Sequence, residues 1–296
     1  MSLANNPVIY LWRKTWKYSK GNRKHVVLYL ILFTFSNIVS FFEPLLVAKI
    51  LNKIQLQGVT SESLPNLLMW LLVFLGINLA FWIFHGPARI LENRNSYLVK
   101  ANYKRYLLDG TMALPAQWHA NHHSGDTIDK IEKGTDALKE FASDTFIIVE
   151  SIIRLIGSYL ALAYFNLYSS FIVLFMVFIT IKLIMRFDKV LIPRWGQLNK
   201  YDNNVSERVF DVLSNITTVI ILRVEKLVSK SIVKKMMAPF QLFIDTNKLE
   251  ESKWFFVSIM SAIMTIGVLG SYLFETVRSG NIVLIGTVYA LYGYIE

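Results

Sequence analysis

The chain has 296 residues, of which 54% are hydrophobic and only 18% are charged. Charged residues make up roughly a quarter of ordinary soluble domains, so this composition excludes a typical soluble fold and favours a membrane protein. The formal net charge is +10, and a chain that is both apolar and basic is expected to collect its basic residues in loops on one side of the membrane. Cysteine is absent, which excludes disulfides, thiolate zinc sites and cysteine nucleophiles.

The first 24 residues predict a cytoplasmic N-terminus that contains an amphipathic helix lying along the membrane. Trp12 and Trp16 alternate there with Arg13 and Lys17. This pattern places aromatic rings at the membrane interface and cations beside anionic lipid headgroups. A basic aromatic segment can also bind nucleic acid, but a position directly before a membrane span disfavours that alternative, and we expect no nucleic-acid partner.

Six apolar stretches predict an all-α membrane protein with six transmembrane helices. They cover residues 26–50, 64–84, 146–165, 168–184, 254–274 and 282–296. A helix rises about 1.5 Å per residue and the hydrocarbon core is about 30 Å thick, so roughly 20 residues cross it. The first five stretches are long enough, whereas the last reaches only about 21 Å, and we expect a truncated sixth span. A re-entrant or interfacial segment is the alternative.

The connections between these stretches differ in length and charge. Most lysines and arginines lie in the N-terminal segment and in two long loops, residues 87–145 and 186–253, so the positive-inside rule places these parts in the cytoplasm. Each long loop has periodic apolar positions with few prolines or glycines, which predicts a helix leaving the membrane, a turn and a helix returning. The predicted helices are residues 88–114, 125–141, 197–213 and 225–251.

Three motifs lie at the turns of the loops and near the C-terminus. Leu114-Pro-Ala-Gln-Trp-His-Ala-Asn-His-His-Ser-Gly-Asp126 is followed by Thr-Ile-Asp-Lys-Ile131, and Asp211-Val-Leu-Ser-Asn-Ile-Thr-Thr-Val219 is followed by Ile-Ile-Leu-Arg-Val-Glu225. Ser279-Gly-Asn-Ile-Val-Leu-Ile-Gly286 leads into Tyr292-Gly-Tyr-Ile-Glu296. In this order and membrane context the motifs resemble the transmembrane domain of ATP-binding cassette (ABC) exporters of the type IV, or type 1 exporter, fold. The resemblance covers essentially the whole chain.

The resemblance implies an elbow helix within residues 1–24 and an exporter transmembrane domain over residues 25–296. Its two loops would end in coupling segments that dock on nucleotide-binding domains; the alternative is that each segment is only a solvated turn. The expected coupling residues are Trp118, His119, Asn121, His122, Gly125 and Asp126 in the first segment and Asp211, Ile216, Val219, Leu222, Arg223 and Glu225 in the second. The second segment departs from the family pattern, with Asn215 for the usual Gly, Asp211 for Glu and Ile220 for Lys, which puts its contact geometry in doubt.

The chain lacks the motif by which the resembled transporters bind ATP. It contains no Gly-x-x-x-x-Gly-Lys-Ser/Thr phosphate loop, so we expect no catalytic residue and no cofactor here. The resemblance implies that ATP and Mg²⁺ bind a missing nucleotide-binding domain, supplied by the same gene or by a separate subunit, and that the full-length parent is an ABC-type ATPase. It also implies a second transmembrane half, identical or different, in an integral assembly of the cell membrane.

Charged residues within apolar stretches predict a transport pathway, because they are costly in a bilayer and are retained for function. Glu150 and Arg154 are four residues apart, so they share one helix face and can neutralise each other. Glu43 precedes Pro44 late in the first span. The alternative is that these side chains lie at the interface, with Arg154 reaching the headgroups.

A metal site is a further alternative at the first turn, where His119, His122 and His123 precede Asp126. Imidazole and carboxylate are ordinary metal ligands, but this spacing matches no established site, and we expect no bound metal.

These observations predict the membrane-spanning half of an ATP-driven exporter, which forms a substrate pathway as a dimer. The alternatives are a secondary carrier or channel driven by an ion gradient, and a membrane scaffold whose cytoplasmic helices bind a partner. A carrier usually has ionisable residues or broken helices at the bilayer midplane, whereas most spans here are unbroken. Lipids, hydrophobic drugs and peptides all fit an apolar pathway, and the sequence does not choose among them.

Overall fold

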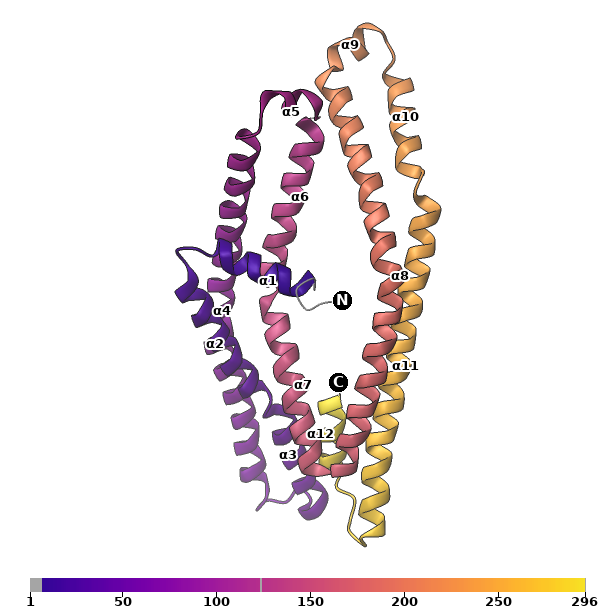
Figure 1. Ribbon diagram of the computed structural model, residues 1–296. Helices are drawn as coiled ribbons and strands as arrows, with labels where there is room; N and C mark the ends of the chain where they lie inside the picture. The colour runs from indigo at the N-terminus through magenta and orange to yellow at the C-terminus, as the bar shows by residue number, and fades with distance from the viewer. Residues whose placement is uncertain (1–6, 123, 296) are drawn as a thin grey trace. The chain divides into compact units, whose positions relative to one another are not determined.

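The computed structural model describes residues 7–122 and 124–295, and within them every regular element is an α-helix (Figure 1). Residues 1–6 of the predicted cytoplasmic N-terminus, together with His123 and Glu296, lie outside this part. The helices are α1 (Pro7–Tyr18), α2 (Arg23–Ser40), α3 (Glu43–Gln57), α4 (Leu64–Met112), α5 (Ala116–Asn121), α6 (Ser124–Ser143), α7 (Thr145–Phe165), α8 (Leu167–Ser214), α9 (Ile216–Ile221), α10 (Glu225–Met237), α11 (Phe240–Arg278) and α12 (Ile285–Ile295).

Five segments of this chain are long and apolar enough to cross a membrane, which confirms the all-helical membrane fold. They are Arg23–Gln57, Leu64–Met112, Ser124–Phe165, Leu167–Ser214 and Glu225–Arg278. The sixth apolar stretch contains α12, which is shorter. Because α4, α8 and α11 continue from an apolar stretch into a loop without interruption, each of these spans and its neighbouring loop segment form one helix.

Two prolines mark places where the observed helices differ from the predicted ones. The first span divides into α2 and α3 at Phe41 and Phe42, and Pro44 lies in the first turn of α3, where a missing N–H leaves no helical bond unmade. The predicted helix 225–251 divides into α10 and α11, because Pro239 cannot donate a backbone hydrogen bond at the start of α11. The break at Pro44 lies where a proline is expected to bend the first span, whereas the break at Pro239 is a correction to the single helix predicted over residues 225–251.

Helix contacts divide the chain into two compact units, of which the first comprises Met1–Tyr97, Glu140–Thr180 and Ser258–Glu296. In this unit α12 packs against α3 and α7. Its main core contains Leu162, Val268 and Leu291, all almost fully buried. Gly286 lies directly against the Ala48 carbonyl, so the backbones of α12 and α3 approach closely because Gly286 has no side chain.

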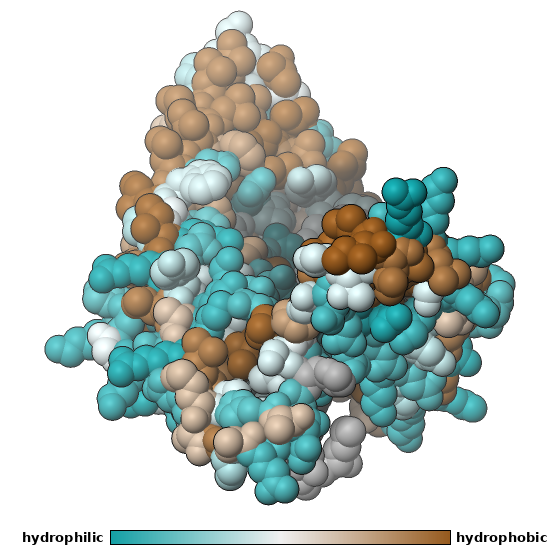
Figure 2. All heavy atoms as spheres, turned by 90° about the horizontal axis from the view of Figure 1, so that it is seen from above, coloured by the Kyte–Doolittle hydropathy of each residue, from teal (hydrophilic) through white to brown (hydrophobic). Residues whose placement is uncertain are grey.

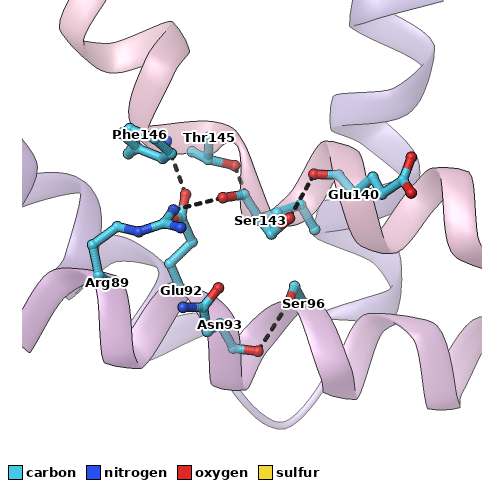
Figure 3. Close-up of polar contacts among 9 residues, drawn as sticks. Arg89, Glu92, Asn93, Ser96, Glu140, Ser143, Thr145 and Phe146 are labelled. Carbon is cyan, nitrogen blue, oxygen red and sulfur yellow. Dashed lines mark hydrogen bonds and ion pairs between the residues drawn. The ribbon is translucent and has the colours of Figure 1, made fainter.

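A polar joint of Arg89, Glu92, Ser143 and Phe146 connects α4 to the break between α6 and α7 (Figure 3). The Glu92 side chain is fully buried and pairs with Arg89. Its Oε1 accepts the Phe146 N–H at 2.8 Å, while Arg89 donates to the Ser143 carbonyl at 2.7 Å. A helix end leaves unpaired N–H and C=O groups, and here one charged pair on α4 satisfies a group on each side of the break.

A second polar contact in this unit joins the turn after α1 to α4. Asn22 donates to the Asn95 side-chain oxygen at 3.0 Å, and Asn95 donates to the Ser19 hydroxyl at 3.1 Å. All three residues are buried. The amphipathic N-terminal helix predicted from the sequence is therefore anchored to the helical bundle by hydrogen bonds.

The second unit comprises Leu98–Lys139 and Ile181–Val257 and contains both predicted loop turns. Ion pairs join α4 to α6, namely Lys100 with Asp136 and Lys104 with Glu132. The hydrogen bond from Lys100 lowers the pKa of the Asp136 carboxyl below its ordinary value of 3.8, which keeps the carboxyl ionised. Lys253 of α11 lies 3.4 Å from Asp188 of α8.

Candidate functional site

The first predicted coupling segment contains the short helix α5, which joins α4 to α6 (Figure 1). Pro115 directly precedes α5 in an extended conformation. On α5, Trp118 is half-buried and stacks on His122, with ring centroids 4.1 Å apart, while His119 contacts the edge of the indole. His119, Asn121 and His122 are exposed. The segment therefore contains an indole ring, that of Trp118, in contact with two imidazole rings.

Gly125 and Asp126 follow in the first turn of α6. Asp126 pairs with Lys130 at 2.6 Å along the same helix. Gly125 is buried against Phe210 of α8, and a Cβ at this position would overlap the Phe210 side chain. The structure thus brings the first segment into contact with α8, one residue before Asp211.

The second predicted coupling segment centres on α9, whose apolar side chains are mostly exposed. Ile220 is 55% exposed, Ile221 73% and Leu222 63%. Figure 2 views the face that α5 and α9 reach, and it shows hydrophobic side chains among hydrophilic ones there. Ile216, at the start of α9, is 40% exposed. Large exposed apolar groups that lie close together on a protein surface are typical of a site that binds a partner.

The chain reverses direction after α9 through a hydrogen-bonded turn centred on Arg223. Arg223 donates its N–H to the Ile220 carbonyl at 3.0 Å, and Val224 donates to the Val219 carbonyl at 3.1 Å. These two bonds form a Schellman motif, which places Arg223 in the left-handed region with φ 53°. Glu225 is exposed and begins α10.

Asp211, the first residue of the second predicted segment, lies apart from α9. It is half-buried on α8 and lines a cavity of about 350 Å³ together with Arg208 and, from α10, Lys235. The twelve predicted coupling residues therefore form three groups: the aromatic α5, the buried Gly125 with Asp126 and Asp211 near α8, and the exposed turn at α9.

The three predicted pathway residues lie together in the first unit, around two cavities. Glu150 and Arg154 form an ion pair on α7, with Oε1 and Nε 3.2 Å apart. Both line a cavity of about 520 Å³ and a neighbouring one of about 220 Å³. Glu43 lines the smaller cavity. Sequence reasoning paired Glu150 with Arg154 by spacing, but only the fold brings Glu43 to the same place.

Several cavity residues were not identified from the sequence. Asn37 and Ser40 of α2 line both cavities, Ser151 and Tyr294 line the larger, and Asn78 lines the smaller. Neutral polar residues within apolar helices are common, so the sequence contains no signal that selects these ones. Among the described residues no group of three or more histidines, aspartates or glutamates is arranged to hold a metal ion, and His123 lies outside them.

The chain thus combines long apolar helices, two helical turns and a cavity lined by polar and apolar side chains. The family model described as the ABC transporter transmembrane region matches residues 26–295. The chain belongs to this family. An ABC transporter transmembrane region is an integral membrane protein and the membrane part of a transporter, so the resemblance predicted from the turn motifs is confirmed. A comparison with curated proteins gives no match.

Proposed function

We propose that this ABC transmembrane region is one half of the pathway of an ATP-driven exporter and receives the motion of ATP-binding cassettes through α5 and α9. The observation that carries this proposal is the exposed apolar surface of α9, defined by Ile216, Ile220, Ile221 and Leu222. Burial of apolar surface is the dominant favourable term in most protein–protein association. Such a surface therefore favours a docked partner.

The long helices support the transmission of movement from the turns. α8 contains 48 residues, which corresponds to about 72 Å at 1.5 Å per residue. It runs without interruption from its apolar stretch to α9. A rigid helix moved at one end displaces its other end, which is how packed helices convert local contacts into movements of whole domains.

In this proposal the cassettes contain the catalytic machinery. They bind ATP and Mg²⁺, and the chain itself has no catalytic residue; the parent protein is an ABC-type ATPase. A second transmembrane half, identical or different, completes the pathway. The basic N-terminus and the loops that contain α5 and α9 lie in the cytoplasm of a cell, on the side where ATP is available.

Docking at α9 is tested by substituting Ile221 in the full-length gene product assembled with its cassettes. Ile221→Glu places a charge at the centre of the apolar surface, and we expect at least roughly tenfold weaker association of the cassette, because burial of an unpaired charge costs several kcal/mol. Ser229→Glu, on an exposed face of α10, is the matched control. Equal cassette association and ATP-dependent transport in both variants would contradict the proposal.

Orientation is tested separately with single cysteines, since the native chain has none. Asn121→Cys on α5 and Glu62→Cys in the connection before α4 are exposed positions. In intact cells a membrane-impermeant maleimide is expected to label Glu62→Cys and to label Asn121→Cys only after the cells are opened. The reverse pattern would overturn a cytoplasmic position of the loops.

A further inference from the structure

The two cavities of the first unit share four polar residues and so form one polar seam. Asn37, Ser40, Glu150 and Arg154 line both the 520 Å³ and the 220 Å³ cavity. They come from α2 and α7, which pack against each other. A ligand in the larger cavity therefore meets the same charged groups as one that extends into the smaller.

Five neutral polar side chains that line the two cavities each donate one hydrogen bond within the protein. The Asn37 amide donates to the Phe33 carbonyl at 2.8 Å, and the Ser40 and Ser151 hydroxyls donate to carbonyls of their own helices at 3.1 and 2.7 Å. The Asn78 amide donates to the Phe74 carbonyl of its own helix, and the Tyr294 hydroxyl of α12 donates to the Phe41 carbonyl after α2. Amide and hydroxyl oxygens keep free lone pairs in this arrangement, so the seam offers acceptors to a ligand.

The charged side chains that line the seam have a negative balance. Glu150 is neutralised by Arg154 at 3.2 Å. Glu43 forms no ion pair with any residue in the described part of the chain. His85 is the other titratable group that lines the smaller cavity. Two carboxylates therefore face one guanidinium. A partly desolvated carboxylate without a counter-charge is stabilised by a bound cation.

Most of the remaining lining of the larger cavity is apolar. Phe41, Leu162, Val173 and Met264 line the larger cavity, and Leu162 and Val173 are buried in the main core. An apolar wall beside an acceptor-rich, net negative seam matches a ligand that has a hydrocarbon or aromatic body and a positive head that donates hydrogen bonds.

We propose that this seam binds a protonated amine with an apolar body, through Glu43 and the Glu150–Arg154 pair, and that such amphiphilic ammonium compounds are the substrate class of the transporter. The second part rests on the function proposed above, whereas binding itself does not. Arg154 limits the affinity for the cation because it occupies Glu150, and the amide and hydroxyl oxygens select N–H donors over a positive charge alone.

The test uses the 296-residue chain in nanodiscs of zwitterionic phosphatidylcholine, with empty nanodiscs to subtract partition into lipid. The probe is a dansyl fluorophore attached to an aliphatic primary amine, and its N-acetylated form is the neutral control. A third probe has a trimethylammonium head. Because acetylation removes the positive charge and most of the N–H donors of the amine, we expect the acetylated probe to bind at least roughly tenfold more weakly, with the trimethylammonium probe between the two.

Substitutions at the seam are expected to act in opposite directions, which a general loss of folding cannot imitate. Glu43→Gln and Glu150→Gln weaken amine binding by roughly tenfold, whereas Arg154→Gln strengthens it by a similar factor because Glu150 is released. Glu275→Gln, at an exposed position of α11, leaves affinity unchanged. Each variant is first checked for an unchanged melting temperature.

Equal affinity for the amine and its acetylated form, or weaker binding by Arg154→Gln, would overturn the proposal. So would equal binding of the trimethylammonium and primary amine probes, since the acceptors would then play no part. These outcomes do not depend on a cassette. If the seam binds amines as expected and the Ile221 experiment fails, the proposed exporter function is wrong and the binding site remains.

Discussion

The carboxylate of Glu92 on α4 accepts the backbone N–H of Phe146 in the first turn of α7, 54 residues later in the chain. Two helices are thus joined by one buried acidic side chain at the position where α6 ends. Arg89 completes the joint by binding both Glu92 and the Ser143 carbonyl. The backbone on both sides of the break between α6 and α7 is therefore bonded to α4.

Loss of the Glu92 carboxylate is expected to destabilise the protein. Glu92→Ala leaves Arg89 without its partner and the Phe146 N–H unpaired, and breaking a buried pair costs about 3–5 kcal/mol. The melting temperature in detergent measures the effect. Glu140→Ala, an exposed acidic residue of α6 close to the same joint, should change it little. A similar small effect at both positions would show that the joint does not contribute to stability.

Gly125 and Gly134 are expected to respond to alanine in opposite directions, although both lie in α6. Gly125→Ala forces its Cβ into Phe210 and should cost about 1–3 kcal/mol. A Cβ at Gly134 meets no atom within 4 Å, so Gly134→Ala should stabilise the helix by about 0.5–1 kcal/mol. Melting temperatures from thermal unfolding compare the two variants. In a Phe210→Ala background the clash is removed, so Gly125→Ala should no longer destabilise the protein. A stabilising Gly125→Ala would contradict the observed contact.

Arg223 occupies a left-handed conformation that glycine adopts more readily. Arg223→Gly should stabilise the turn after α9 by up to about 1 kcal/mol, whereas the β-branched Arg223→Val should destabilise it by more. Hydrogen exchange of the Val224 amide, which closes the Schellman motif, reports the local change. The control is Lys230→Gly inside α10, which should cost about 1 kcal/mol. Slower exchange in the valine variant would rule out this geometry.

The contact between α12 and α3 predicts that alanine substitution at two glycines of α12 has different effects on stability. Gly286→Ala places a Cβ against the Ala48 backbone, and we expect a loss of about 1–3 kcal/mol. At Gly293, in the same helix, a Cβ would lie 3.5 Å from Pro44, an ordinary contact, so Gly293→Ala should be tolerated. Equal melting temperatures for the two variants would mean that the helices do not approach as closely as observed.

The broad fold could be predicted from the sequence because the length and spacing of apolar stretches along the chain indicate which segments are buried in a membrane or packed as helices. Long apolar stretches and periodic loops are sufficient to predict spans and helical projections, and proline and polar residues marked the turn at α5. The break at Pro239 was missed, although its missing N–H is a local signal that could have identified it.

The candidate site was harder to predict from the sequence, because its contacts join residues that are far apart in the chain. Glu150 and Arg154 were paired correctly because their spacing is a helical one. Arg89 and Glu92 resembled ordinary cytoplasmic charges, and nothing in their spacing indicated a bond to Phe146. The sequence likewise does not distinguish Gly125, where an added Cβ would overlap Phe210, from Gly134, where it would meet no atom within 4 Å.

The hydrogen bonds between α3 and the start of α12 join residues that are synthesised far apart in time. Asn52 accepts the Gly286 N–H, and Gln55 bonds both Val283 and Ile285, across 228 to 234 residues of sequence. Contacts of such long range form late and slow the folding of a chain. As the protein is made, the Asn52 and Gln55 amides therefore lack these partners until α12 has been made, and the incomplete chain is open to misfolding during this interval.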